Sequence, residues 1–186
     1  MTPAPMPENE LQRLAALLRL RLLDAVPDQS FEAITRCVSA GTGAPVALIS
    51  LVDADRQWFM CRVGLDARET PREISFCGHA IMADKPLIVP DALRDPRFAD
   101  NPLVTGPPFV RAYLGIPLVT RDGHALGTLC SIDSQPKYWT PKMTASVVDL
   151  AKITVALIEA RAMKMELGEL FETCASLCRP RDELAA

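Results

Sequence analysis

Residues 113–133 read YLGIPLVTRDGHALGTLCSID, and the rest of the chain is interpreted around this stretch. Two apolar segments flank the Asp122-Gly123 pair. Such a pair between strand-like segments is among the strongest short-range signals of a β-hairpin, because glycine tolerates the positive φ angle that the turn needs. Both arms carry apolar residues on both alternating faces, which is typical of a sheet that is covered on two sides. We therefore expect a central hairpin with packed structure above and below it.

Pro117 constrains the register of this hairpin, because proline has no N–H group to donate to the strand ladder. A two-residue loop would make Pro117 face Thr128 as a hydrogen-bonded pair. A three-residue loop with Gly123 in a bulge would place Pro117 at a non-bonded position instead. We therefore expect the three-residue loop.

The composition indicates a single domain and argues against nucleic-acid binding and a membrane-spanning segment. The chain has 186 residues, of which 49% are hydrophobic, and this suits one well-buried domain with helical extensions. The net charge is −3 and no stretch concentrates Lys and Arg, which argues against nucleic-acid binding. The first ten residues lack the pattern of a signal peptide, and no window approaches the roughly 18 apolar residues of a membrane span. We expect a cytoplasmic protein.

The cysteines and histidines do not suggest a metal site. The six cysteines form no CxxC pair, and only His79 and His124 could join them as ligands. We expect most of these cysteines to be free thiols that pack as small apolar residues. They are Cys37, Cys61, Cys77, Cys130, Cys174 and Cys178.

A first helix is predicted over residues 8–24, before Pro27 ends the unit. Its apolar residues recur at helical spacing and form one stripe. The stripe would either cover the sheet or pack against a partner helix across a dimer. It consists of Leu11, Leu14, Leu18 and Leu22.

A second helix and a second hairpin are predicted next. The helix would run from Ser30, as its N-cap, to Gly41, as its C-cap glycine. The helical spacing of apolar residues ends there. Residues 45–52 and 57–63 have the composition of buried strands joined by a turn. Together these strands predict an antiparallel pair.

Residues 64–110 form the least regular part of the chain and contain seven prolines. A segment this long between strands is more often a binding loop or a lid than a simple connection. Within it, residues 75–83 predict a short helix capped by Ser75, residues 87–89 a brief strand, and residues 91–94 a helical turn.

A long helix is predicted after the central hairpin. Thr140 and Pro141 supply an N-cap and a first-turn proline, and the helical pattern continues to about Cys178. At 1.5 Å per residue this helix would be roughly 55 Å long, which exceeds the width of such a domain. Its far half therefore needs a partner. The partner would be a second copy, in a parallel or antiparallel bundle, or the chain's own tail after a break near Gly168.

Catalytic patterns are not recognisable, and we expect that the chain is not an enzyme. No Ser/His/Asp spacing, P-loop or GxGxxG motif is present. Cys77 and His79 are the most suggestive neighbours. However, residues two apart on a short helix point about 200° apart, so a thiolate–imidazole pair is not expected. Aromatic side chains in or beside the irregular segment would fill the core or line a small-molecule pocket beneath it.

Four stretches of the chain resemble a GAF domain. They are RQWFMCRVGLD (56–66), TPREISFCGHAI (70–81), KPLIVPDALRDPRFADNPLV (85–104) and the hairpin over 113–133. The resemblance covers residues 13–161, with 1–12 as an N-terminal lead and helix start and 162–186 as a C-terminal helix extension and tail. It implies an α+β fold of the GAF/PAS-like type. A central antiparallel sheet of about five to six strands would carry terminal helices on one face and a pocket of loops and short helices on the other.

The resemblance also implies a function. It predicts a stand-alone, bacterial-type signalling domain that senses an unidentified small molecule, forms a homodimer through its terminal helices, and acts on a separate kinase or cyclase. No cofactor is specified. The alternative is a pocketless interaction module that docks a separate signalling enzyme. The residues expected to bind the ligand are Phe76, Cys77, His79, Phe98, Phe109, Tyr113 and Asp133.

An enzymatic alternative within the same family is disfavoured. Cys77 matches one cysteine of the GAF-type free methionine sulfoxide reductases. Their attacking cysteine would lie just before the central hairpin, where this chain has residues 109–112 without a cysteine. Ser131 also replaces one of two acidic residues, which leaves Asp133. A sulfoxide is not attacked without the missing thiolate.

Overall fold

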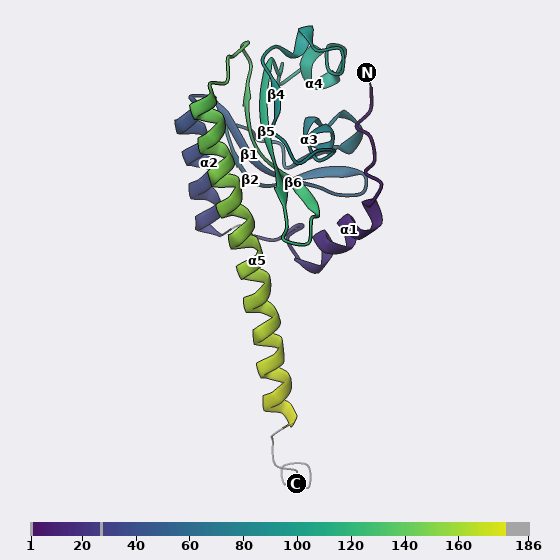
Figure 1. Ribbon diagram of the computed structural model, residues 1–186, viewed down its shortest axis with the longest axis vertical. Helices are drawn as coiled ribbons and strands as arrows, with labels where there is room; N and C mark the ends of the chain where they lie inside the picture. Colours follow the sequence, from purple (N-terminus) through teal and green to yellow (C-terminus); the bar gives the residue numbers. More distant parts are fainter. Residues whose placement is uncertain (1, 27, 178–186) are drawn as a thin grey trace.

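The computed structural model describes residues 2–26 and 28–177. Its centre is a six-stranded sheet with the strand order β3-β2-β1-β6-β5-β4, in which every neighbouring pair is antiparallel (Figure 1). The expected α+β architecture is therefore confirmed. The strands are β1 (Val46–Val52), β2 (Arg56–Val63), β3 (Glu69–Pro71), β4 (Leu87–Val89), β5 (Ala112–Val119) and β6 (Ala125–Asp133).

The helices divide between the two faces of the sheet. Figure 1 shows α2 and α5 side by side on one face, and α3 and α4 beyond the other. The helix α1 lies at the end of the sheet beside the β5–β6 hairpin. The helices are α1 (Glu10–Arg19), α2 (Gln29–Thr42), α3 (Phe76–Ala80), α4 (Pro102–Thr105) and α5 (Pro141–Leu177), with short 3-10 helices at Arg72–Ile74 and Ala92–Arg94.

The sheet separates two apolar cores, as the hairpin pattern predicted. Successive residues of one strand face opposite sides, so Leu48 lies in the core beneath α3 whereas Ile49 lies in the core beneath α2 and α5. The core on the α2 and α5 side includes Val38, Leu51, Leu114, Leu129, Val147 and Ile158. The core on the α3 side includes Phe59, Phe76, Phe98, Val104, Tyr113 and Cys130.

The central hairpin has the expected three-residue loop. The backbone N–H of Thr120 donates to the carbonyl of His124, and Gly123 has a φ of 81°. The non-bonded position expected for Pro117 stays a prediction, because the register gives its partner residue and not its hydrogen bonds. A second irregularity between Pro117 and Val119 restores the pairing of Pro117 with Thr128, because one extra residue in the strand cancels the offset that the loop introduces.

The predicted stripe of the first helix is wrong. The helix α1 ends at Arg19, because Arg21 and Asp24 adopt positive φ angles of 48° and 56° that no helix contains. Leu11 and Leu18 are 81% and 61% exposed. The buried positions of α1 are Arg13 and Leu17.

Arg13 replaces the leucine stripe as the anchor of α1. Its guanidinium donates to both carboxylate oxygens of Glu10, at 2.8 and 2.7 Å, and to the carbonyls of Val52 and Ala125, at 2.7 and 3.4 Å. Arg72 binds the same carboxylate from the other side, at 2.5 Å. These bonds tie α1 to the ends of two strands, so a charged side chain of the helix turns inward together with Leu17.

The remaining predicted elements occur with shifted ends. The helix α2 is capped by Asp28 and Gly43 rather than Ser30 and Gly41. The strand β3 and the helix α4 were not predicted, because three or four residues carry no periodic pattern. Ser75 caps α3 as expected.

The helix α5 is continuous through Gly168, so the alternative of a break there is wrong. Its first half covers the sheet with four buried residues, and its second half extends beyond the domain (Figure 1). The expected end at Cys178 and the expected break at Pro27 lie outside the described residues. Within the part of the chain that is described, no helix is long and apolar enough to cross a membrane.

Candidate functional site

Five of the seven expected ligand-binding residues pack together beneath α3. The rings of Phe76 and Phe98 stack with centroids 4.0 Å apart and planes 13° apart. Tyr113 lies 5.2 Å from Phe76 in a tilted arrangement, and His79 approaches Phe98 edge-on at 4.9 Å. With Cys77, which is also buried, these side chains form what we call the α3 cluster.

The position of α3 depends on polar contacts at its start. The hydroxyl of Ser75 accepts a hydrogen bond from the N–H of Gly78 at 2.8 Å and donates to Gln57 Oε1 on β2 at 2.5 Å. Gln57 in turn donates to Thr70 on β3 at 2.6 Å. These bonds fix the first turn of the helix over the sheet, which directs Phe76 and Cys77 inward.

Tyr113 lies along its own strand over Gly115. A Cβ atom on Gly115 would meet the hydroxyl of Tyr113 at 2.2 Å, so only glycine leaves room for the ring. From there the hydroxyl donates to Cys77 Sγ and lies within hydrogen-bonding distance of Thr128 Oγ1, both at 3.4 Å. Tyr113 therefore occupies the floor of the α3 cluster.

Cys77 is surrounded by groups that can hydrogen-bond to its sulfur. Besides Tyr113, the side chains of Cys130, Ser50 and Thr128 lie close enough to influence its ionisation. Burial raises the pKa of the Cys77 thiol, but the hydrogen bonds from Cys130 and the three hydroxyls outweigh burial and hold this pKa well below its usual range. The hydrogen bond to Cys77 and burial raise the pKa of Cys130. Of the two sulfurs, Cys77 is the one favoured to ionise.

His79 connects the α3 cluster to the N-terminal segment. Its Nε2 atom lies 3.3 Å from the carbonyl oxygen of Thr2, and the backbone of Ala4 donates to the carbonyl of Glu73. Burial lowers the pKa of His79, which favours the neutral imidazole. The first residues of the chain therefore lie over the outer side of α3, as the trace from the N-terminus in Figure 1 shows.

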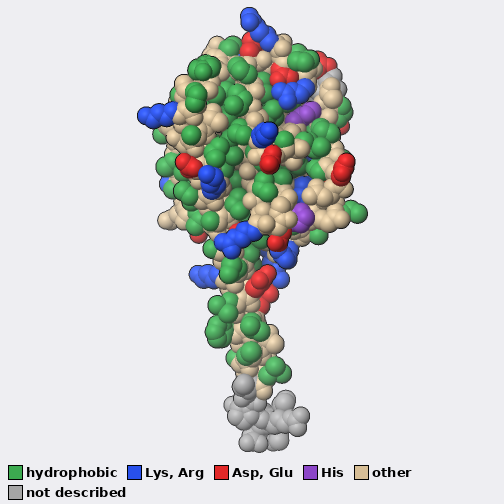
Figure 2. Space-filling view, viewed as in Figure 1, with side chains coloured by type: hydrophobic (Ala, Val, Ile, Leu, Met, Phe, Trp, Pro, Cys, Tyr) green, Lys and Arg blue, Asp and Glu red, His purple; other side chains and the backbone are tan. Residues whose placement is uncertain are grey.

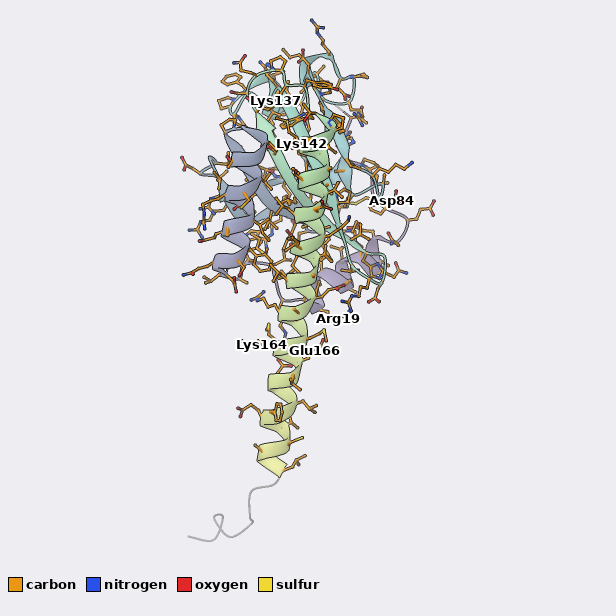
Figure 3. The ribbon with its side chains drawn as sticks, turned by 60° about the vertical axis from the view of Figure 1, so that its left-hand side comes forward. Arg19, Asp84, Lys137, Lys142, Lys164 and Glu166 are labelled. Atoms are coloured by element: carbon orange, nitrogen blue, oxygen red, sulfur yellow. The ribbon has the colours of Figure 1, made fainter. Side chains whose placement is uncertain are left out.

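Phe109 and Asp133 have other surroundings. Phe109 is 48% exposed and adopts a φ of 54° in the loop before β5. Asp133 accepts from Lys137 Nζ at 3.1 Å, and Lys137 also donates to the carbonyl of Gly43 at the end of α2. Figure 3 shows Lys137 near the start of α5, so Asp133 helps to join that region to α2.

Two surface hollows lie outside the α3 cluster. One of about 200 Å³ lies between α1, the end of α3 and the central hairpin, and Arg13 lines it. The other, of about 1160 Å³, runs along β2 and α2 and is lined by Trp58, Arg36 and Arg62 among others. Within the described residues, no group of three or more His, Cys, Asp or Glu side chains is placed to hold a metal ion.

Four residues that surround the α3 cluster were not among the expected site residues. Thr128 and Cys130 alternate on one face of β6, and a period of two could have identified them as neighbours. Ser50 pairs with Thr128 across the β1–β6 ladder. No local signal indicates the role of Gly115, which depends on the rotamer of Tyr113.

The comparisons with known proteins agree on the fold. The family model named GAF domain matches residues 26–159. A Pseudomonas aeruginosa protein named cyclic di-GMP phosphodiesterase is 46% identical over 137 residues, which cover 74% of this chain. The matched part is 23% of that protein, so the chain spans about a quarter of the curated relative's length.

Solved structures share the fold at low sequence identity. The GAF domain of an Acinetobacter phosphoenolpyruvate-protein phosphotransferase has a TM-score of 0.59 at 19% identity and covers 88% of this chain and 99% of its own. The blue-light-absorbing form of the Thermosynechococcus elongatus PixJ GAF domain has a TM-score of 0.59 at 19% identity, covering 93% and 97%. A type II free methionine-R-sulfoxide reductase from Thermoplasma acidophilum has a TM-score of 0.59 at 12% identity, covering 71% and 92%.

The expectation that the chain is not an enzyme is contradicted by the Pseudomonas relative, whose name states an enzymatic activity. The expectation rested on the lack of catalytic spacings in these 186 residues. That criterion was too narrow. The matched region is 23% of the Pseudomonas protein, and a lack of catalytic motifs in such a region does not decide whether a whole protein is an enzyme.

Proposed function

Because the chain belongs to the GAF domain family, we propose that it senses a small molecule at the α3 cluster and passes the signal through a dimer of α5 helices to cyclic di-GMP hydrolysis. The observation that carries this proposal is the 46% identity, over 74% of the chain, to a protein named as a cyclic di-GMP phosphodiesterase. A phosphodiesterase thus takes the place of the kinase or cyclase expected from the sequence.

The proposed ligand site is the α3 cluster. It combines apolar walls from Phe76 and Phe98 with polar groups from Tyr113, Cys77 and His79, which is the usual composition of a small-molecule site. Since these side chains contact one another directly, binding requires that Tyr113 or α3 moves. Such a movement would link occupancy of the site to β5, and β5 also packs against α5 through the other core.

The proposed signal path is α5, because this helix has two apolar faces. One face packs on the sheet through Val147, Ala151 and Ile158. The second face is exposed, and Figure 2 shows hydrophobic side chains along the part of α5 that leaves the domain. Its members recur every three and four residues, which is the heptad pattern of a coiled coil. They are Ile153, Ala156, Ala160, Met163, Leu167, Leu170, Cys174 and Leu177, and we call them the α5 seam.

The charges beside the α5 seam favour a parallel dimer. In the heptad, Glu159 and Glu166 occupy g positions and Lys164 occupies an e position. Glu159 binds Arg121 of its own chain at 3.1 Å, and a parallel pair would add Lys164 of the other copy beside it. An antiparallel pair would instead place glutamates next to glutamates. Figure 3 shows Lys164 and Glu166 on the stretch of α5 just beyond the domain, where a second helix has room to approach. A parallel dimer also directs both chains' signals to the same end.

Thermal unfolding of the purified chain with nucleotides, amino acids and tetrapyrroles tests the ligand site. We expect one class of compound to raise the unfolding temperature of the wild type and of Arg62→Ala, which alters the larger hollow. The shift should be lost in Phe98→Leu, which alters the α3 cluster. Stabilisation that depends on Arg62 and not on Phe98 would move the site to the larger hollow, and no shift with any compound would remove the sensing role.

A chimaera tests the link to cyclic di-GMP. Residues 26–177 replace the matching region of the Pseudomonas protein, and hydrolysis of cyclic di-GMP is measured with and without the compound found above. We expect the rate to change at least twofold on ligand addition, and the change to disappear when Leu167 and Leu170 are replaced by aspartate. The proposed coupling is contradicted if the chimaera binds the compound and its rate of cyclic di-GMP hydrolysis stays the same.

A further inference from the structure

The α3 cluster contains a pair of sulfur atoms that ligand binding does not explain. Cys77 lies in α3 and Cys130 in β6, and both are buried free thiols of the same core. The hydroxyl of Tyr113 donates to Cys77 Sγ at 3.4 Å and lies over Gly115, which pairs with Cys130 across the β5–β6 ladder. The two cysteines come from elements on opposite sides of the same core, so a bond between them would join the short helix to the centre of the sheet.

The surroundings of Cys77 stabilise an anion. A buried thiolate is normally disfavoured, because it loses its hydration. Here the hydroxyl of Tyr113 donates to Cys77 Sγ at 3.4 Å and lies 3.4 Å from the hydroxyl of Thr128, which pairs with Ser50 on β1. These hydroxyls come from three different strands, so the sheet holds them in place before any reaction.

Other described cysteines lack this combination. Cys61 is buried, and burial together with the negative charges of Glu32 and Asp28 raises its pKa to about 12. Cys37 and Cys174 are exposed on helices. Thiolate character and a neighbouring thiol therefore coincide at Cys77 among the cysteines that the structure describes, and this is the arrangement of an oxidisable cysteine with a resolving partner.

We propose that Cys77 and Cys130 are a peroxide-sensitive thiol pair that closes reversibly to a disulfide. In the first step the Cys77 thiolate attacks one oxygen of hydrogen peroxide, the O–O bond breaks, and the departing hydroxide takes up a proton to leave as water. In the second step the sulfur of Cys130 attacks the sulfenic acid of Cys77. The S–O bond breaks, and hydroxide leaves with the proton of Cys130 as a second water. Two thiols lose two electrons to one peroxide, and a dithiol reductant reverses the change.

The disulfide would alter the α3 cluster. It would hold α3 against β6. It would also turn the sulfur of Cys77, which accepts the hydrogen bond of Tyr113, into a disulfide sulfur that cannot ionise. A movement of Tyr113 or α3 on ligand binding would then be restricted. The pair thus provides a way for oxidants to act on the same region that we propose to bind the small molecule.

Access to Cys77 requires motion, because its side chain is buried beneath α3 and the N-terminal segment. Hydrogen peroxide is close to water in size, so a brief opening of this short helix suffices. We expect oxidation to be slower than that of the exposed Cys174, but at least tenfold faster than that of the buried Cys61.

The experiment maps thiols in the full chain. Reduced protein is treated with hydrogen peroxide under native conditions, quenched with catalase, denatured, alkylated with N-ethylmaleimide and digested without reductant for mass spectrometry. We expect the peptides of Cys77 and Cys130 to be joined, at a mass two hydrogens lower than the sum of the separate peptides, while Cys61 is alkylated. Dithiothreitol should restore both thiols.

Two variants sharpen the result. Cys61→Ser is the matched control and should form the same cross-link, whereas Cys130→Ala should leave a sulfenic acid at Cys77 that dimedone traps. The proposal is overturned if Cys77 and Cys130 are both alkylated after Cys37 and Cys174 have been oxidised. It is also overturned if Cys77 in the wild type proceeds to sulfinic acid without joining Cys130. The wild-type measurement decides between these outcomes even if a variant does not fold.

Discussion

Glu10 binds two buried guanidinium groups, so its replacement should lower the free energy of unfolding. Arg13 and Arg72 are 1% and 3% exposed, and both bind the carboxylate of Glu10. In Glu10→Gln the two cations lose their counter-charge, and we expect the free energy of unfolding at pH 7 to fall by about 3 kcal/mol. Urea unfolding measures this change. Glu8→Gln, an exposed site in the same segment, should unfold like the wild type.

The same carboxylate should make stability depend on acid pH. Burial raises the pKa of Glu10, but the hydrogen bonds and charges of Arg13 and Arg72 outweigh it and lower the pKa from 4.5 to about 2. A depressed pKa in the folded state means that the stabilisation is complete above pH 4.5 and is lost as the pH falls towards 2. The difference between wild type and Glu10→Gln should therefore shrink over this window. A difference that stays constant down to pH 2 would show that charge is not its source.

Gly115 leaves room for the ring of Tyr113, so alanine should be destabilising there. The added Cβ would lie 2.2 Å from the hydroxyl of the buried Tyr113, which has to shift, and we expect a loss of about 1–3 kcal/mol in urea unfolding. Gly41→Ala is the matched control, because its Cβ meets nothing within 4 Å in the helix α2 and should add about 0.5–1 kcal/mol. In a Tyr113→Leu background the cost of Gly115→Ala should largely disappear, and a cost that persists contradicts this explanation.

Among the elements, α3 depends on the side chain that begins it. Ser75 caps the helix and also donates to Gln57 Oε1, so Ser75→Ala removes two buried hydrogen bonds. We expect the chain to lose about 1–2 kcal/mol of stability. Hydrogen exchange should show faster exchange at Gly78 than in the wild type. Ser134→Ala, at an exposed loop position, should change neither quantity; unchanged exchange at Gly78 in Ser75→Ala would mean that packing alone holds α3.

Elements with a long or regular pattern followed the sequence closely, and short or polar ones did not. The strands β1, β2, β5 and β6 and the helix α5 were predicted because their apolar residues repeat over many positions. The helix α1 was misjudged, because its leucines repeat at helical spacing while its buried contacts are made by Arg13. An arginine whose guanidinium finds a carboxylate and two carbonyls is satisfied when buried, and periodicity alone gives no sign of this.

For the whole molecule, the α5 seam predicts association. We expect sedimentation equilibrium at micromolar concentration to give twice the monomer mass for the wild type. Leu167→Asp combined with Leu170→Asp should give the monomer mass, because two charges per chain would be buried in the seam. Gly168→Asp combined with Ala175→Asp adds the same charge outside the seam and should stay dimeric. A wild type that is monomeric at these concentrations removes the proposed dimer.

The sequence alone determined the class of fold, the two-sided sheet, the cap of α3 and the extension of α5 beyond the domain, because each follows from residues close together in the chain. The expected site residues also included all the aromatic residues of the α3 cluster. Only the tertiary structure decided that Arg13 faces inward, that Tyr113 lies over Gly115, and that Cys77 and Cys130 share one core. These contacts join elements far apart in sequence, and their energies depend on burial, rotamer and charge that arise when the elements pack together.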